Sequence, residues 1–569
     1  MEQNFKLQLR FLLRPCIQVK TPTLPRRIII VGGVAGGASA AAKARRVDEN
    51  AEIHVFERGP YISFANCGLP YFIAGEIDDR AKLIIMTPEK FWSRSQVHAH
   101  VNHEALSINR AAKTTSVKGP DGITCDVAYD KLILSQGAKP IVPPIPGVEL
   151  PHVFTLRDIP DMDRIAQFVD EHKPKRAVVI GGGFIGLEMA EAFHHRGIHV
   201  TIVERNPHIL PLLDRDMATH LQNQIRRTDF DFKADANATK FTSEGVEFAD
   251  GSQLAADLIL LSVGVKAEVE LAKTAGLEIG VTGGVKTNGR MESSDPNIYA
   301  VGDAAETMHA LTGARARIAL AGPANRQGRI AGANAAGAKL TYPGALGTSI
   351  VRVLNMTAGF TGLNSAQVAK AGFSFFTSLT RDHSHAHYYP GAMPVMIKLI
   401  VEEGTGRLLG AQVLGEQGID KRVDVLATAI AGKMTVDDLE NLDLAYAPPF
   451  GSANDPVNTA GFVAGHISRG DIPTVAPETW QPGGEFLLDV RDADEVAELG
   501  KLKDAVNIPL DELRDRLGEL PCDRRIVAYC QKGQRGYLAT CLLRGHGFEN
   551  TANLRGGFLQ ARLNGLPTE

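Results

Sequence analysis

A strand, a glycine-rich turn, a helix and a second strand follow one another twice in this sequence. The first copy extends from Arg27 to Glu57 and the second from Ala177 to Glu204. In each copy a short apolar run precedes the glycines, small or apolar residues at helical spacing follow them, and a second apolar run ends in glutamate. This order is typical of the βαβ unit that binds dinucleotides. Two copies predict two nucleotide-binding domains of the α/β class.

The glycines of the two turns are suited to binding a pyrophosphate. The first glycine permits a tight bend, and the later ones let the phosphates approach free N–H groups at the helix N-terminus. The first turn departs from the usual pattern because Val34 takes the middle position, so a turn without a ligand is the alternative there. The predicted contacts are Gly32, Gly36 and Gly37 in the first turn and Gly181, Gly183 and Gly186 in the second.

A glutamate ends the second strand of each copy. Glu57 is placed to accept hydrogen bonds from the ribose of an adenosine. Glu204 takes the same place in the second copy, where a carboxylate favours the free 2′-hydroxyl of NADH and repels the 2′-phosphate of NADPH. Arg205 lies beside it and weakens that preference. We therefore expect NADH, with NADPH possible.

Composition restricts the class of protein further. A length of 569 residues suggests three or four domains. The net charge of −4 argues against nucleic acid or an anionic membrane as the main partner, and no apolar run is long enough to span a bilayer. The six cysteines contain no C-x-x-C pair and are too scattered for a disulfide framework. We expect a protein of the reducing cytoplasm.

A third motif follows the second βαβ unit. Residues 297–304 read Asn-Ile-Tyr-Ala-Val-Gly-Asp-Ala, a strand ending in Gly-Asp. With the two turns before it, the chain resembles the FAD-dependent pyridine nucleotide disulfide reductases from Arg27 to about His466. The resemblance implies FAD at the first turn, NAD(P)H at the second, a homodimer formed through residues 343–467, and FAD contacts at Arg58 and at Asp303, whose carboxylate would bond the ribityl chain.

The redox motif contains a single cysteine. Residues 63–70 read Ser-Phe-Ala-Asn-Cys-Gly-Leu-Pro, with Cys67 and no second thiol nearby. This pattern resembles the single-cysteine branch of the family, which holds NADH oxidases, NADH peroxidases and coenzyme A disulfide reductases. A lone redox cysteine is either oxidised to a sulfenate or forms a mixed disulfide with its substrate. A buried structural cysteine is the alternative.

Other residues favour the coenzyme A branch. Oxidases and peroxidases of the branch carry a histidine in the first turn, where this chain has Ala35. Tyr388 and Tyr446 match two tyrosines that reach the thiol site from the partner subunit in coenzyme A disulfide reductases, and their phenols can protonate a departing thiolate. Structural hydrogen bonds are the alternative for both. The resemblance also implies coenzyme A contacts at Ser39, Arg46, Ser63, Asn66, Asn325 and Arg329. Arg46 could instead cap its helix.

The last 85 or so residues contain a second candidate cysteine. Cys530 follows an apolar strand and opens the loop Cys-Gln-Lys-Gly-Gln-Arg. The region resembles a single-domain rhodanese, which implies a persulfide on Cys530 and a sulfur-transfer loop containing Lys532, Gly533 and Arg535. Loop N–H groups at a helix start and two cations should favour a sulfur anion. An inactive, structural module is the alternative.

Three alternating histidines, His383, His385 and His387, would share one face of a strand. Such a face can bind a transition metal, but no Cys or carboxylate ligand is near in sequence, so we expect a polar strand face and no metal.

The predicted fold is α/β, with two Rossmann-like domains, an α+β dimerisation domain and an α/β rhodanese domain. The predicted division is an extension at 1–26, expected to be disordered with a targeting role as the alternative, an FAD domain at 27–145 and 265–342, an NAD(P)H domain at 146–264, a dimerisation domain at 343–467, a linker at 468–484 and a rhodanese domain at 485–569.

The predicted function is reduction of coenzyme A persulfide, polysulfide or coenzyme A disulfide by NADH through a mixed disulfide at Cys67. FAD is the expected cofactor, coenzyme A or another small thiol or persulfide the expected ligand, and Cys530 would handle sulfane sulfur. An NADH oxidase or peroxidase is one alternative. A sulfur-relay or redox-sensing protein is the other.

Overall fold

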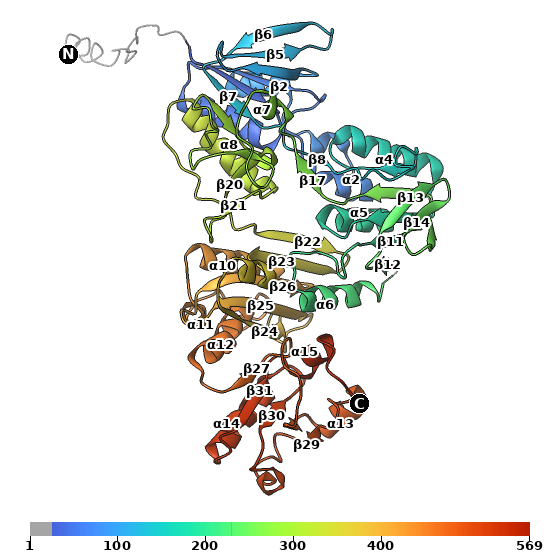
Figure 1. Ribbon diagram of the computed structural model, residues 1–569, viewed down its shortest axis with the longest axis vertical. Coiled ribbons are helices and arrows are strands. Elements are labelled where there is room, and N and C mark those ends of the chain that lie inside the picture. The colour runs from blue at the N-terminus through green and yellow to red at the C-terminus, as the bar shows by residue number, and fades with distance from the viewer. Residues whose placement is uncertain (1–24, 229) are drawn as a thin grey trace, which may run out of the picture.

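The computed structural model describes residues 25–228 and 230–569. Nearly all of the predicted extension at 1–26 therefore lies outside the described residues. Four regions of the chain each form a five-stranded sheet. Figure 1 shows them in a column, with the first domain at the top, the second to its right, the third in the middle and the C-terminal domain at the bottom.

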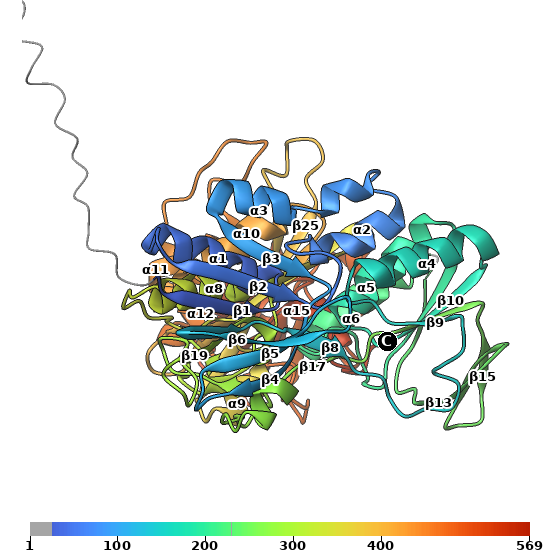
Figure 2. The same cartoon turned by 90° about the horizontal axis from the view of Figure 1, so that it is seen from above.

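The first domain is built on a parallel sheet. Its strands, in spatial order, are β19 (Ile298–Ala300), β7 (Lys131–Leu134), β1 (Arg27–Val31), β2 (Glu52–Glu57) and β3 (Val97–Val101). Helices α1 (Ala35–Val47) and α8 (Ala321–Ala335) lie side by side (Figure 2). They can approach closely because Gly328 has no side chain. A Cβ at this position would lie only 2.1 Å from the Gly36 carbonyl oxygen. An antiparallel sheet of β4 (Glu104–Asn109), β5 (Thr114–Lys118) and β6 (Thr124–Ala128) lies across the parallel sheet from α1.

The second domain repeats this architecture. Its parallel strands are β12 (Phe230–Lys233), β11 (His199–Val203), β10 (Arg176–Ile180), β16 (Leu258–Leu261) and β9 (Val153–Phe154), with helices α4 (Ile159–His172) and α5 (Phe184–His195). Although the predicted boundary at residue 264 assigns Leu258–Val263 to the second domain, the strand pattern also predicted that this run and Ile298–Asp303 return the chain to the first domain. That prediction is wrong for the first segment, because β16 pairs with β10. Its apolar run fits a buried central strand of either sheet, so the pattern alone did not decide between them.

The third domain is an antiparallel sheet covered by helices. The strands, in spatial order, are β22 (Ser349–Val353), β23 (Met356–Gly362), β26 (Leu408–Gly415), β25 (Pro394–Glu402) and β24 (Phe375–His383). Helices α10 (Ile419–Ala431) and α12 (Pro456–Arg469) complete its core. The sequence pattern predicts strands at 349–354, 395–401 and 408–414 and a helix at 420–431, and β22, β25, β26 and α10 match these ranges within one or two residues.

The C-terminal domain has a parallel sheet in the order β27 (Thr474–Val475), β31 (Thr551–Leu554), β30 (Ile526–Tyr529), β28 (Phe486–Asp489) and β29 (Val506–Asn507). Its helices are α13 (Ala493–Leu499), α14 (Gln534–Gly545) and α15 (Gly557–Leu563). The segment 468–484 was predicted to be a linker, but it supplies the edge strand β27. A two-residue strand between prolines carries no periodicity from which it could be recognised.

The alternating histidines do not share a strand face. Strand β24 ends at His383, and the chain then turns, so that His385 is buried against the Pro390 carbonyl oxygen while His387 is exposed. No helix within 25–228 or 230–569 is long and apolar enough to cross a membrane.

Candidate active site

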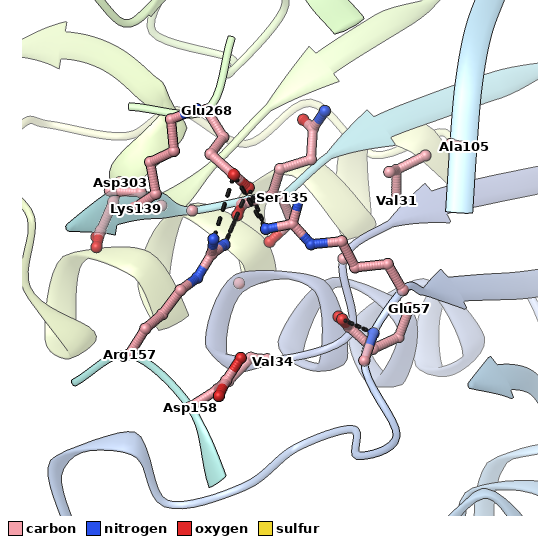
Figure 3. Close-up of a pocket in the computed structure, with 18 of the residues that line it drawn as sticks. Val31, Val34, Glu57, Ala105, Ser135, Lys139, Arg157, Asp158, Glu268 and Asp303 are labelled. Carbon is pink, nitrogen blue, oxygen red and sulfur yellow. Dashed lines mark hydrogen bonds and ion pairs between the residues drawn. The ribbon is translucent and has the colours of Figure 1, made fainter. Parts of the chain in front are cut away.

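A cavity of about 510 Å³ lies beside the first glycine turn. It is lined by the ends of β1 and β2, by Gly302 and Asp303 after β19, and by Arg157 and Asp158 from the second domain. In Figure 3 these side chains converge on the cavity from both domains. A site at the carboxyl ends of parallel strands, between two domains, is where a dinucleotide is expected.

Both glycine turns have the close backbone approach that a pyrophosphate requires. Gly32 and Gly181 have φ of +96° and +111°. A Cβ at Gly37 would lie 1.8 Å from the Gly32 carbonyl oxygen, and one at Gly186 would lie 2.0 Å from the Gly181 oxygen. Any side chain at these positions would push the helix start away from the strand end. The first turn thus fits a dinucleotide although Val34 interrupts its pattern.

Each of the two predicted glutamates accepts hydrogen bonds from backbone N–H groups in and next to its own glycine turn. Glu57 accepts the N–H of Gly33 at 2.8 Å on one oxygen and that of Gly59 at 2.8 Å on the other. Glu204 likewise accepts the N–H of Gly182 at 2.8 Å and of Asn206 at 2.9 Å. A carboxylate oxygen has more than one lone pair, so each group can still accept a ribose hydroxyl.

The remaining lining residues fit a flavin dinucleotide. Asp303 lies in the cavity, and burial raises the pKa of its carboxyl group. A ligand hydroxyl would supply the hydrogen bond that stabilises the carboxylate. Arg58 and Arg157 both pair with Glu268, at 2.9 Å each (Figure 3). The three charges join the two domains beside the cavity.

Cys67 lies in the short 3₁₀ turn η1 (Asn66–Gly68), just before helix α2 (Leu69–Ala74). Asn66 lines the cavity, and α2 shares a hydrophobic core with α5 of the second domain. The thiol is therefore held between the two nucleotide sites. Although solvent reaches Cys67, partial burial raises the pKa of its thiol, and the nearby Glu188 and Asp303 carboxylates raise it further.

Glu188 is a candidate residue that the motif analysis missed. It lies on α5, two residues after Gly186, and the Tyr71 hydroxyl donates to it at 3.3 Å. Burial raises the pKa of Glu188 to about 7 and, with the Glu188 carboxylate, that of Tyr71 to about 12. An acidic residue in the otherwise apolar start of a helix was the available signal.

Four of the predicted coenzyme A contacts are on the surface of α1 and α8. Ser39 donates to the Asn325 amide oxygen at 2.9 Å, which brings these two residues together. Arg46 and Arg329 are exposed. Arg46 also donates to the Ala42 carbonyl oxygen at 3.0 Å, a contact that is compatible with the alternative role of capping its helix.

The other two predicted contacts shortly precede Cys67 in the sequence. Ser63 has a left-handed φ of 44° and is fixed by the Gly33 carbonyl oxygen, while Asn66 directly precedes the cysteine. Backbone strain of this kind persists only where the surrounding structure imposes it.

Tyr388 and Tyr446 form an exposed pair in the third domain. Their hydroxyl groups are 3.0 Å apart, and the two side chains are 67% and 47% exposed. The hydrogen bond to Tyr446 raises the pKa of Tyr388. Phe450 nearby in sequence is also 73% exposed. Exposed aromatic groups of this size are typical of a contact surface.

Cys530 directly follows β30 and is 2% exposed. The N–H of Gly533, the residue before α14, donates to its sulfur at 3.1 Å. Arg535 lies close enough to Cys530 for their charges to interact, and Glu495 holds its guanidinium at 2.6 Å. Lys532 is exposed on the same loop. The loop thus presents a hydrogen-bond donor and positive charge to the sulfur, which stabilises an anion there.

One group of metal-ligand side chains, Glu76, Glu191 and His195, was found among the described residues. The Arg352 guanidinium pairs with both carboxylates, at 2.8 Å from Glu191. A cation already occupies this group, and it joins the first three domains rather than forming a metal centre.

Comparison with known proteins shows which family models match the parts of the chain. Residues 26–328 match the pyridine nucleotide-disulphide oxidoreductase model, 348–455 match the dimerisation domain of that family, and 477–562 match the rhodanese-like domain. A NAD(P)H coenzyme A polysulfide/persulfide reductase of Pyrococcus horikoshii is 34% identical over 443 residues, 76% of this chain and 97% of that protein.

Two solved structures cover nearly the whole chain. Reduced CoADR-RHD of Bacillus anthracis is 44% identical with a TM-score of 0.93, over 96% of this chain and 99% of that one. A NAD-dependent persulfide reductase from A. fulgidus is 36% identical with a TM-score of 0.88, over 94% and 99%. By these matches, the chain belongs to the pyridine nucleotide-disulphide oxidoreductases and carries a C-terminal rhodanese-like domain.

Proposed function

We propose that this protein is a flavin-dependent NAD(P)H reductase of coenzyme A persulfide, polysulfide or coenzyme A disulfide, with sulfane sulfur handled by Cys530. The observation that carries the proposal is the place of Cys67 between the two nucleotide sites, without a partner thiol in its segment. Relatives named for reduction of coenzyme A persulfide and of persulfide support it.

FAD in the first cavity would carry electrons from NAD(P)H to the sulfur of Cys67. The chain itself binds the two nucleotides through its glycine turns. It also holds Cys67 in a fixed 3₁₀ turn between them. For the second site we propose NADH, because the buried Glu204 carboxylate would repel a 2′-phosphate, while the exposed Arg205 leaves NADPH possible.

The sulfur chemistry at Cys67 is a displacement. The thiolate attacks the coenzyme A sulfur of a persulfide, the S–S bond breaks, and hydrosulfide leaves with the bonding electron pair. Two electrons and a proton then cleave the mixed disulfide, which releases coenzyme A as a thiol and restores the Cys67 thiolate. With coenzyme A disulfide the first leaving group is a coenzyme A thiolate.

A departing thiolate has to gain a proton. Two carboxyl groups, Glu188 and Asp303, lie near Cys67, and Glu188, whose pKa is about 7, can supply a proton when it is protonated. We propose that Tyr388 and Tyr446 of a second copy provide the phenols at this site. Their exposure and the family match of residues 348–455 to a dimerisation domain support a homodimer formed through residues 343–467.

Binding of coenzyme A is proposed for the surface that contains Ser39 and Asn325. Its charge suits a phosphorylated ligand, because Arg46 and Arg329 are exposed on the same two helices. Ser63 and Asn66 would then guide the thiol end to Cys67.

The test is steady-state NADH oxidation by the holoenzyme with three acceptors, namely coenzyme A persulfide, coenzyme A disulfide and molecular oxygen. We expect turnover with the two coenzyme A substrates that Cys67→Ser abolishes. Fast oxygen or peroxide reduction with no turnover of either coenzyme A substrate would instead identify an oxidase or peroxidase.

A further inference from the structure

A buried polar cluster lies where the second, third and C-terminal domains meet. Asp216, on α6 (Arg215–Ile225) of the second domain, accepts from Lys398 of β25 at 2.9 Å on both oxygens. Lys398 also pairs with Asp214 at 3.0 Å. Figure 1 shows α15 of the C-terminal domain next to α6 and β24. From α15, Gln560 donates to Asp216 at 2.6 Å.

The amide of Gln560 is bound at both ends. Its nitrogen donates to Asp216, and its oxygen accepts from Arg381 of β24 at 3.1 Å. Gln560 is only 1% exposed. The two cations, Lys398 and Arg381, balance the carboxylates of Asp214 and Asp216, so the bridging side chain has to be neutral with one donor and one acceptor end.

Arg381 also reaches the turn that precedes α15. Its guanidinium donates to the Gly556 carbonyl oxygen at 3.4 Å. Gly556 and Gly557 have φ of +67° and +62°, and a Cβ at Gly557 would lie 2.3 Å from the carbonyl oxygen of Cys530. The turn is therefore in direct contact with the backbone of the cysteine.

Two backbone hydrogen bonds fix this turn to the sulfur-transfer loop. Phe558 donates to the Cys530 carbonyl oxygen at 2.8 Å and Leu559 to that of Gln531 at 3.1 Å. A Cβ at Gly533 would lie 3.3 Å from the Gly556 nitrogen. A shift of the turn would therefore move Gly533, whose N–H donates to the Cys530 sulfur.

We propose that Gln560 is a positioning residue for Cys530: its amide, bridging Arg381 and Asp216, holds the Gly556–Gly557 turn against the sulfur-transfer loop and so keeps the Gly533 N–H on the sulfur. The reductase domains thereby set the geometry of the rhodanese-like site. The inference rests on the proposed sulfur-handling role of Cys530.

The reaction to be measured is the loading of Cys530 with sulfur from thiosulfate. The Cys530 thiolate attacks the outer sulfur of thiosulfate, the S–S bond breaks, and sulfite leaves with the bonding pair, which leaves a persulfide anion on the cysteine. The rate depends on the thiolate fraction, and that fraction depends on the donors facing the sulfur.

The pH profile of this reactivity separates local positioning from general damage. The charged groups beside Cys530 are Arg535 and its partners Glu495 and Asp492. Those facing Gln560 are Arg381, Lys398, Asp214, Asp216 and, near Arg381, His220. Burial lowers the pKa of His220 to about 4 and that of Arg381 to about 10. These two groups therefore keep their protonation states between roughly pH 6 and 9.

The experiment uses the full-length holoenzyme carrying Gln560→Leu, which keeps the approximate size and removes both hydrogen bonds. Two rates are measured across pH, thiosulfate loading and iodoacetamide alkylation of Cys530, each followed by peptide mass spectrometry. We expect loading at neutral pH to fall about tenfold and the alkylation midpoint to move to higher pH. Reduction of coenzyme A disulfide, which uses Cys67 and not Cys530, stays unchanged.

Gln167→Leu, on the exposed face of α4, is the matched control and leaves both rates unchanged. If Gln560→Leu fails to fold, Arg381→Lys keeps the charge but cannot reach both Gly556 and Gln560, and it predicts the same shift. Unchanged midpoints in the folded variants would overturn the inference. Sulfur loading that survives Cys530→Ser would instead overturn the proposed role of Cys530.

Discussion

The two candidate cysteines lie in opposite electrostatic surroundings. Cys67 is exposed, lies in a 3₁₀ turn, and has the carboxylates of Glu188 and Asp303 as charged neighbours, which raise the pKa of its thiol. Cys530 is buried at the end of a strand and receives the N–H of Gly533 and the charge of Arg535. The carboxylates beside Cys67 disfavour a thiolate, so a bound cofactor, the substrate or a second subunit would have to stabilise it. The loop around Cys530 stabilises an anion by itself.

The two sites also lie in different parts of the molecule. Cys67 precedes α2, in the upper half of Figure 1, and Cys530 follows β30 near its lower end. The comparison implies a division of work, in which Cys67 takes part in electron transfer and Cys530 in sulfur transfer. The following variants test each side of that division.

Cys67→Ser has the largest expected effect. Reduction of coenzyme A disulfide by NADH should fall by about 1000-fold or more, because no other thiol of the segment can form the mixed disulfide. Sulfur loading of Cys530 from thiosulfate should stay as in the parent protein. Cys530→Ser is the reciprocal control, and equal loss of both activities in either variant would contradict the division.

The tyrosine pair tests whether Cys67 relies on a second copy. Tyr388→Phe combined with Tyr446→Phe should lower kcat for coenzyme A disulfide by about 100-fold, the range of a lost general acid. KM should change little, and thiosulfate loading should not change. Sedimentation analysis shows whether the variant is still dimeric. A dimeric double variant with normal kcat would exclude the phenols as proton donors.

Arg535→Gln tests the anion-stabilising side of the comparison. Removing the cation near Cys530 should slow thiosulfate loading about tenfold. Arg544→Gln, a half-buried position on the same helix that pairs with Glu549, provides the control. Normal loading in Arg535→Gln would show that the loop N–H groups suffice.

The smallest expected effect comes from Glu188→Gln. The amide still accepts from Tyr71 but carries no charge, so the pKa of Cys67 should fall. The change appears above about pH 7, where Glu188 is ionised in the parent protein, and disappears below it, where Glu188 is protonated. Alkylation of Cys67 as a function of pH measures it, with the exposed Glu171→Gln as control.

Much of this fold could be predicted from the sequence. Glycine turns, apolar strand runs and the Gly-Asp motif are local patterns, and they predicted both nucleotide-binding sheets. The Cys530 loop was local as well, because its donor Gly533 is only three residues from the sulfur.

Contacts between distant segments could not be predicted in this way. Glu188 affects Cys67 only because α5 packs against α2. Gln560 meets Asp216 from the far end of the chain. Strand β27 depends on its partner β31, and the turn after His383 on packing around His385. None of these has a periodic signal, since each depends on tertiary packing.

Mapping of adducts by peptide mass spectrometry tests the division of work most directly. The holoenzyme is treated with coenzyme A disulfide or with thiosulfate. Half of each sample then receives NADH, and both halves are digested and compared. We predict coenzyme A on Cys67 alone after the first treatment, lost on reduction by NADH, and one added sulfur on Cys530 alone after the second. Coenzyme A on Cys530, or Cys67 that carries oxygen and never coenzyme A, would contradict it.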